Sequence, residues 1–73
     1  MIIEVYDAPM LIKASGLEID DVLHTNEIVS NITSIPNNKM EIELYLANDK
    51  NYHAKLSLSP TDIIELKGRV VIK

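Results

Sequence analysis

Apolar and polar residues alternate along the second half of the chain, most regularly between residues 40 and 46. The apolar positions fall at every second residue: Met40, Ile42, Leu44 and Leu46. The positions between them are occupied by Glu41, Glu43 and Tyr45. Because successive side chains of a strand point to opposite faces, this period predicts a strand with one buried face and one face in water.

A second run of the same period predicts that this strand forms a hairpin with the next one. After the polar residues 48–51, the period continues at Tyr52, Ala54, Leu56 and Leu58. A three-residue loop over 49–51, with Asn51 in the left-handed conformation, would close the hairpin. The buried face would then hold three cross-strand pairs: Leu46 with Ala54, Leu44 with Leu56, and Ile42 with Leu58. On the other face, Tyr45 would meet Lys55, with Glu43 as the diagonal neighbour of Lys55.

The residues after this hairpin carry signals for a short helix. Ser59 has the chemistry of an N-cap, Pro60 suits the first helical position, and Asp62 can reach back to Ser59. Gly68 stands where a left-handed residue would end the helix. We therefore predict a helix over residues 60–67, followed by a last strand over residues 69–73.

The pattern of apolar and polar residues is less regular in the first half of the chain. Residues 1–7 and 10–14 are expected to form strands, interrupted at Ala8-Pro9 because proline cannot donate to a sheet. Residues 17–25 fit either a short helix, which we favour, or an acidic loop. Residues 27–35 have the β-branched composition of a strand, and Pro36-Asn37-Asn38 supplies turn residues after it.

These elements predict one domain, residues 1–73, of the β-rich α+β class. The expected architecture is a small curled antiparallel sheet, or a partly open barrel, of about five strands with the short helix over 60–67 before the last strand. A helical turn between the fourth and fifth strands of a curled sheet resembles the topology of SH3-like and Sm-like barrels. No sequence motif of either group is present.

Composition restricts the chemistry and the compartment. The chain has no cysteine, which excludes disulfides, cysteine-based zinc sites and thiolate catalysis and fits a reducing cytoplasm. No apolar run approaches the ~20 residues that span a bilayer, and no basic segment precedes an apolar one as in a secretory signal. We therefore predict a cytoplasmic protein that does not contact membranes.

Charge is unevenly distributed along the sequence. The net charge is −4, and residues 1–30 hold six acidic residues against one basic residue, Lys13. An acidic patch formed by this half would repel phosphates and anionic lipids. Nucleic acid is therefore a less favoured partner than protein.

The sequence offers few groups for catalysis or metal binding. Asp20, Asp21 and His24 are the best metal-like cluster, but no second cluster completes the coordination, so we interpret them as a solvated acidic face. His53 has no partner at a spacing that would form a catalytic dyad. With only two glycines there is no phosphate-binding loop. We expect no enzyme activity, no cofactor and no metal.

The end strands are the strongest indication of partners. Ile2, Ile3 and Val5 in the first strand, and residues 70–72 in the last, make both strands apolar on both faces. Either these strands pair with each other inside a barrel, or one of them adds to a neighbouring subunit.

We therefore predict a non-catalytic protein-binding module that docks on a protein partner or self-associates. Its size and composition suit a small inhibitor or accessory protein of a phage or mobile element. The predicted partner-binding residues are Tyr45, Glu43, Lys55, Asp20 and Asp21. The alternative is a small barrel that binds single-stranded nucleic acid by stacking on Tyr45 beside Lys55.

Overall fold

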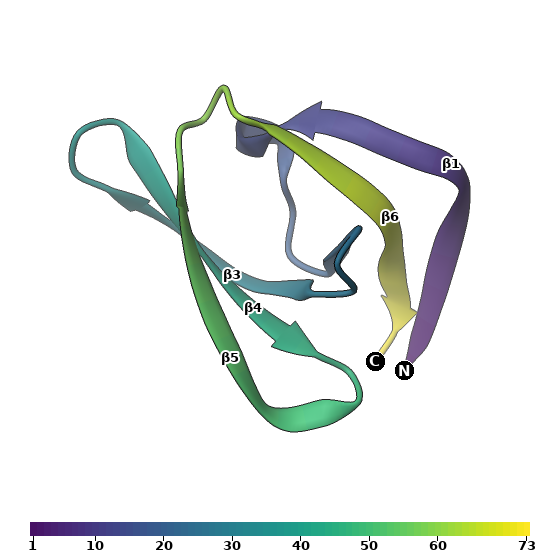
Figure 1. Cartoon of the computed structure of the whole chain (residues 1–73). Helices are drawn as coiled ribbons and strands as arrows, with labels where there is room; N and C mark the ends of the chain where they lie inside the picture. The colour runs from purple at the N-terminus through teal and green to yellow at the C-terminus, as the bar shows by residue number, and fades with distance from the viewer.

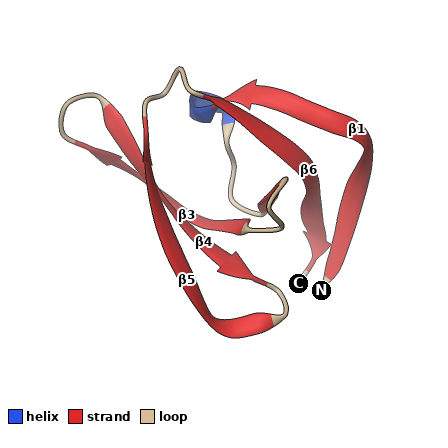
Figure 2. Ribbon diagram, in the orientation of Figure 1, coloured by secondary structure: helices blue, strands red, loops and turns tan.

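The computed structural model describes all residues, 1–73, and contains one antiparallel sheet of six strands (Figures 1 and 2). The strands are β1 (Ile2–Lys13), β2 (Asp21–Leu23), β3 (Ile28–Ile35), β4 (Lys39–Leu46), β5 (Asp49–Leu58) and β6 (Ile63–Ile72). The only helical segment is the 3-10 turn η1 (Ala14–Gly16). The β-rich character is as predicted, whereas the expected count of about five strands is too low. None of the helices has both the length and the apolar character needed to cross a bilayer.

The sheet curls into a half-barrel that stays open between its two edge strands. The strand order is β1-β6-β2-β3-β4-β5, so the edges are β1 and β5 (Figure 1). The first and last strands pair with each other, which was one of the two predicted arrangements, and Ile2 faces Ile72. As a result, the two chain ends lie side by side and β6 is an interior strand (Figure 1).

The predicted helix over residues 60–67 is wrong. Its capping signals are used by a tight turn instead: the Ser59 N–H donates to Asp62 Oδ2 (2.9 Å), and the Asp62 N–H donates to the Ser59 carbonyl (3.0 Å). After this turn the chain extends as β6, because apolar residues recur at alternate positions from Ile64 through Leu66 to Val70. The capping residues therefore form only a turn. They do not start a helix, because the residues that follow have the two-residue apolar period of a strand.

Gly68 does not end a helix and has no left-handed conformation. It lies in the middle of β6, where it faces Val5 of β1 on one side and Val22 of β2 on the other. A Cβ atom at this position would overlap the carbonyl group of Glu4 and lie 3.2 Å from the Val5 Cα. The glycine is required because β1 approaches the β6 backbone closely.

The helix that we favoured for residues 17–25 is also wrong, and this segment contains β2, a strand that was not predicted. Asp20 has a positive φ of 80°, a conformation that aspartate tolerates better than most residues. Its N–H donates to the Val29 carbonyl and its carbonyl accepts from the Val70 N–H, both at 2.9 Å. These bonds, together with β2, place the segment between β3 and β6.

The β4–β5 hairpin forms as predicted but in a different register. Its loop is Ala47-Asn48, and Asn51 has no positive φ. Leu44 faces Ala54, Ile42 faces Leu56, and Met40 faces Leu58. Over these pairs the shift from the predicted register is two residues, so their side chains keep the predicted face. Between Leu44 and Leu46 the register shifts again, and Leu46 faces Asp49. Glu43, and not Tyr45, therefore faces Lys55.

Two further predictions for the strands are confirmed, and a third is corrected in part. Residues 28–35 form β3, and Asn37 and Asn38 adopt positive φ in the turn after it. Residues 2–13 form one strand instead of two, but its pairing is interrupted as expected. Between Val5 and Met10 the β1–β6 register shifts, so a bulge contains Pro9.

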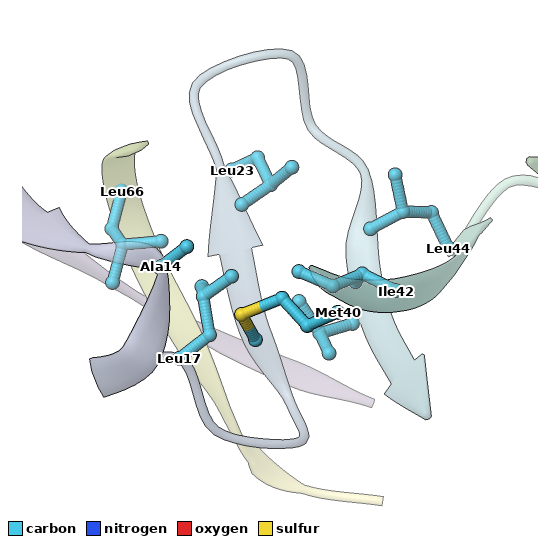
Figure 3. Packing of buried hydrophobic residues seen from close by; sticks show 8 residues of the cluster. Ala14, Leu17, Leu23, Met40, Ile42, Leu44 and Leu66 are labelled. Carbon is cyan, nitrogen blue, oxygen red and sulfur yellow. The ribbon is translucent and has the colours of Figure 1, made fainter. Parts of the chain in front are cut away.

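The interior of the half-barrel is filled by one apolar cluster. Its buried members are Ala14, Leu17, Leu23, Val29, Met40, Ile42, Leu44 and Leu66 (Figure 3). A smaller cluster contains Val22, Ile28 and Val70, with Ile3 and Tyr45 packed against it. Val22 and Leu23 are successive residues of β2, yet they belong to different clusters, so β2 is buried on both faces.

Candidate protein-binding surface

Large apolar side chains are exposed mainly on the two strands that carry the chain ends. Of ten such exposed residues, eight lie in or next to β1 and β6: Met1, Ile2, Val5, Met10, Leu11, Ile63, Val71 and Ile72. We call these eight residues the terminal apolar surface. Scattered apolar residues are normal on a protein surface, but such a concentration on adjacent strands is typical of interaction sites.

The two edge strands differ in how they are protected against pairing with another chain. β5 carries Lys50 and Lys55 among other polar residues, which is a usual protection for an edge. β1 has one lysine, Lys13, and two acidic residues, Glu4 and Asp7, and its pairing with β6 shifts between Ile2 and Ile3 and at the bulge around Pro9. On either side of the Pro9 bulge, four apolar side chains of β1 are exposed: Ile2, Val5, Met10 and Leu11. The β1 side of the sheet is therefore better suited to contact another molecule.

A groove opens where β1 and β6 face the β2–β3 turn and the β4–β5 loop. Its volume is about 320 Å³, at the lower end of the ~300–1,000 Å³ usual for ligand sites. Five lining residues are apolar: Ile3, Val5, Val22, Leu46 and Ala47. The other three are Asn26, Asn48 and Lys67. We call it the terminal groove, and Val5 also belongs to the terminal apolar surface.

The other two hollows of the molecule are less suited to binding an apolar segment. The hollow beside the β3–β4 turn has a volume of about 390 Å³, but only three of its eight lining residues are apolar. The remaining hollow is smaller, about 160 Å³, and three of its nine lining residues are charged: Glu18, Asp21 and Arg69. The terminal groove is therefore the candidate site.

The polar rim of the terminal groove carries one charge. The Lys67 ammonium donates a hydrogen bond to Asn26 Oδ1. No carboxylate lines the groove, and the two ion pairs of the structure involve Lys55 and Lys73. Lys67 is thus positioned by a neutral amide and its charge is not compensated.

A hydrogen bond beside the groove joins β5 to the residue that follows the β2–β3 turn. The Tyr52 hydroxyl on β5 donates to Glu27 Oε2, next to the β2–β3 turn, at 2.5 Å. This bond, with the electrostatic effect of the carboxylate, raises the pKa of Tyr52 above its ordinary value. Asn26 directly precedes Glu27, and Asn48 lies in the loop before β5, so the bond links the segments that carry these two groove residues.

Replacing Glu27 with glutamine should lower the pKa of Tyr52 toward that of a free tyrosine, ~10. The neutral hydroxyl makes the bond, so its stabilising contribution is present below the ordinary tyrosine pKa and lost as pH rises through the raised one. The midpoint can be followed by the Tyr52 ring signals in NMR spectra between pH 8 and 12. Glu4→Gln, on β1, is the control and should leave the midpoint unchanged. Equal midpoints in Glu27→Gln and the unmodified chain would contradict the assignment.

Three of the predicted partner-binding residues lie on the outer face of β4 and β5. Glu43 is half-buried and accepts a hydrogen bond from Asn31 Nδ2 (2.9 Å). Lys55, its cross-strand partner, is exposed and lies 3.9 Å from the Glu41 carboxylate. Tyr45 faces Ile28 and packs on the smaller apolar cluster. The predicted nucleic-acid platform assumed that Tyr45 and Lys55 are opposite each other. In the structure they are not.

Of the other two predicted residues, Asp20 lies in the turn before β2 and Asp21 is the first residue of β2. Asp20 Oδ2 forms an ion pair with Lys73 (2.9 Å), and this contact raises the pKa of Lys73. Asp21 Oδ2 accepts a hydrogen bond from the Glu18 N–H (2.8 Å). Burial raises the pKa of Asp21, and the hydrogen bond opposes that shift. Nowhere do three His, Cys, Asp or Glu side chains converge as a metal site would require.

The groove residues Asn26, Asn48 and Lys67 were not singled out from the sequence. Asn26 lies in the β2–β3 turn, Asn48 in the β4–β5 loop and Lys67 in β6, and only the folded sheet brings them together. The sequence signal that pointed to this region was the apolar character of both end strands. Comparisons with protein-family models, with curated proteins and with solved structures find no match to this chain.

Proposed function

We propose that the chain is a non-catalytic protein-binding module that docks on a partner protein through β1 and β6. The observation that carries this proposal is the terminal apolar surface, which holds eight of the ten exposed large apolar side chains. We expect the module to act in the cytoplasm as a small inhibitor or accessory protein.

The size of the exposed surface supports the proposal. The accessible surface is 4911 Å². A compact monomer of 8.2 kDa is expected to expose about 4,500 Å², so the open sheet leaves extra surface in water. Burying the exposed apolar side chains against a partner would contribute about 25 cal/mol per Å².

The most informative pair of side chains is Leu11 and Ile63, which are 66% and 61% exposed. Ile63 faces Lys13, and Leu11 is two residues from Lys13 along β1, so all three side chains share one face. An apolar partner surface would therefore contact Leu11 and Ile63 together. Neither side chain belongs to either buried cluster, so replacing them should leave the fold intact.

The double variant Leu11→Thr/Ile63→Thr should lose partner capture at least tenfold relative to the unmodified chain. Threonine keeps strand propensity but removes apolar area, and each lost side chain is worth about 1.5 kcal/mol or more when buried. The immobilised chain is exposed to lysate of the organism that encodes it, and retained proteins are quantified by mass spectrometry. Light scattering over a dilution series tests whether a second copy is the partner.

The matched control is Leu56→Thr, which removes a partly exposed apolar side chain from the opposite edge strand, β5. It should retain the same proteins as the unmodified chain. A chain that stays monomeric and retains nothing, or a double variant that retains everything, would refute the proposal.

A further inference from the structure

We infer that the terminal groove binds the carboxyl-terminal segment of a partner protein, with apolar side chains in the groove and the α-carboxylate at Lys67. The inference rests on the proposed function and specifies the partner's chemistry. It follows from the lining, the charge and the rigidity of the groove.

The lining requires an apolar occupant of limited size. Ile3, Val5 and Val22 form one side of the groove, and Leu46 and Ala47 reach it from the β4–β5 side. Val5 is 62% exposed, so an apolar side chain placed against it would remove apolar surface from water. A volume of about 320 Å³ equals that of ~10 water molecules, which suits one or two side chains and not a folded element.

The charge requires that the occupant be anionic at one end. Lys67 is the only charged residue of the groove, although the whole chain has a net charge of −4. One of its three N–H donors is used by Asn26, so two remain for a ligand. The side-chain amides of Asn26 and Asn48 add neutral donors to the rim. A carboxylate would find donors here and no competing acid.

The rim is organised before any ligand binds. Asn26 has a positive φ of 74°, and its N–H donates to the Leu23 carbonyl (2.9 Å). The Leu23 N–H donates to the Glu27 carbonyl (2.8 Å), which closes the turn. Since Asn26 in turn holds the Lys67 ammonium, little side-chain entropy is lost when an anion binds.

A chain end satisfies these conditions better than an internal acidic residue. Backbone groups on both sides of an internal residue would have to cross the apolar lining without hydrogen-bond partners. A terminal residue brings its side chain and its carboxylate together, and the chain leaves the groove in one direction only. Capture of a terminal carboxylate by donor groups is a known mode of peptide recognition.

The test uses fluorescence anisotropy with an N-terminally labelled peptide, Gly-Ser-Gly-Val-Val-Leu, as the free acid and as the C-terminal amide. The free acid should bind at least tenfold more tightly than the amide, because hydrogen bonds to charged groups are the stronger ones. Lys67→Gln should reduce free-acid binding to the level of the amide and leave amide binding unchanged. Val5→Thr should weaken both peptides. Lys39→Gln, which removes a lysine from the end of β4 opposite to Leu46, should change neither.

Three outcomes would overturn the inference. They are equal affinity for acid and amide, no binding of either peptide up to millimolar concentration, and an unchanged free-acid affinity in Lys67→Gln whose circular dichroism shows it to be folded. Decanoate is also tested as a competitor of the labelled free-acid peptide. Tighter binding of decanoate than of the peptide would likewise overturn the inference and assign the groove to a free fatty acid. If the peptides fail while Leu11→Thr/Ile63→Thr still loses its partner, only the groove inference fails.

Discussion

Replacing Gly68 with alanine should lower the free energy of unfolding by about 3 kcal/mol, the upper part of the usual range for overpacking. The added Cβ would lie 3.1 Å from the Glu4 carbonyl carbon and 3.2 Å from the Val5 Cα. These are backbone atoms, so the clash is relieved only if β1 moves away from β6. Because a chain of this length is stable by only about 4–11 kcal/mol, such a loss is large. Urea unfolding followed by circular dichroism measures it.

Gly16→Ala is the matched control for Gly68→Ala. A Cβ at Gly16 would find its nearest atom, Ile12 Cδ1, at 4.0 Å, and Gly16 has no positive φ. Its free energy of unfolding should therefore stay within about 0.5 kcal/mol of that of the unmodified chain. Equal effects of the two substitutions would show that β1 does not approach β6 as the structure describes.

Replacing Leu44 with alanine should cost about 3–4 kcal/mol, because it leaves a cavity in the fully buried interior of the half-barrel. Leu44 is 0% exposed and belongs to the main apolar cluster with Ile42 and Met40 (Figure 3). The same urea experiment applies. In contrast, Leu56→Ala on the neighbouring strand should cost about 1 kcal/mol, since that side chain is 38% exposed. Similar losses at both positions would contradict the described interior.

Side-chain periodicity allowed the centre of the fold to be predicted from the sequence. The alternation from Met40 to Leu46 was sufficient to identify the faces of β4, and those faces survived a two-residue error in register. The error arose at the loop: Asp49-Lys50-Asn51 and Ala47-Asn48 are both reasonable connections, and the difference changes no apolar position. The register of the hairpin could therefore be determined only from the packing of the whole sheet.

Local sequence signals predicted the wrong element where pairing between distant strands determines the structure. The hydrogen bond from the Ser59 N–H to the Asp62 carboxylate is typical of a helix start, yet the alternation through Leu66 and Val70 places the following residues in a strand. The requirement for glycine at position 68 comes from Glu4 and Val5, more than sixty residues away in the sequence. No local rule could have indicated it.

The candidate site was only partly predictable, for the same reason. The apolar end strands were interpreted as a hint of partners; of their side chains, Ile2, Val5, Val71 and Ile72 are exposed, whereas Val70 is buried. None of the predicted residues Glu43, Tyr45 and Lys55 lines the terminal groove, although Tyr45 packs on the same small apolar cluster as Ile3 of β1. Their role in partner binding stays a prediction. Asn26 and Lys67 are forty-one residues apart, and only the insertion of β2 beside β6 brings them into contact.

Site-specific photo-crosslinking tests most directly whether partners bind at the β1 and β6 side of the sheet. A photoreactive amino acid is introduced at position 5 or 11 on β1, and at position 55 on β5 for comparison, before irradiation in lysate. We predict that positions 5 and 11 become linked to the same protein and that position 55 does not. Crosslinks from position 55, with none from positions 5 and 11, would contradict the account.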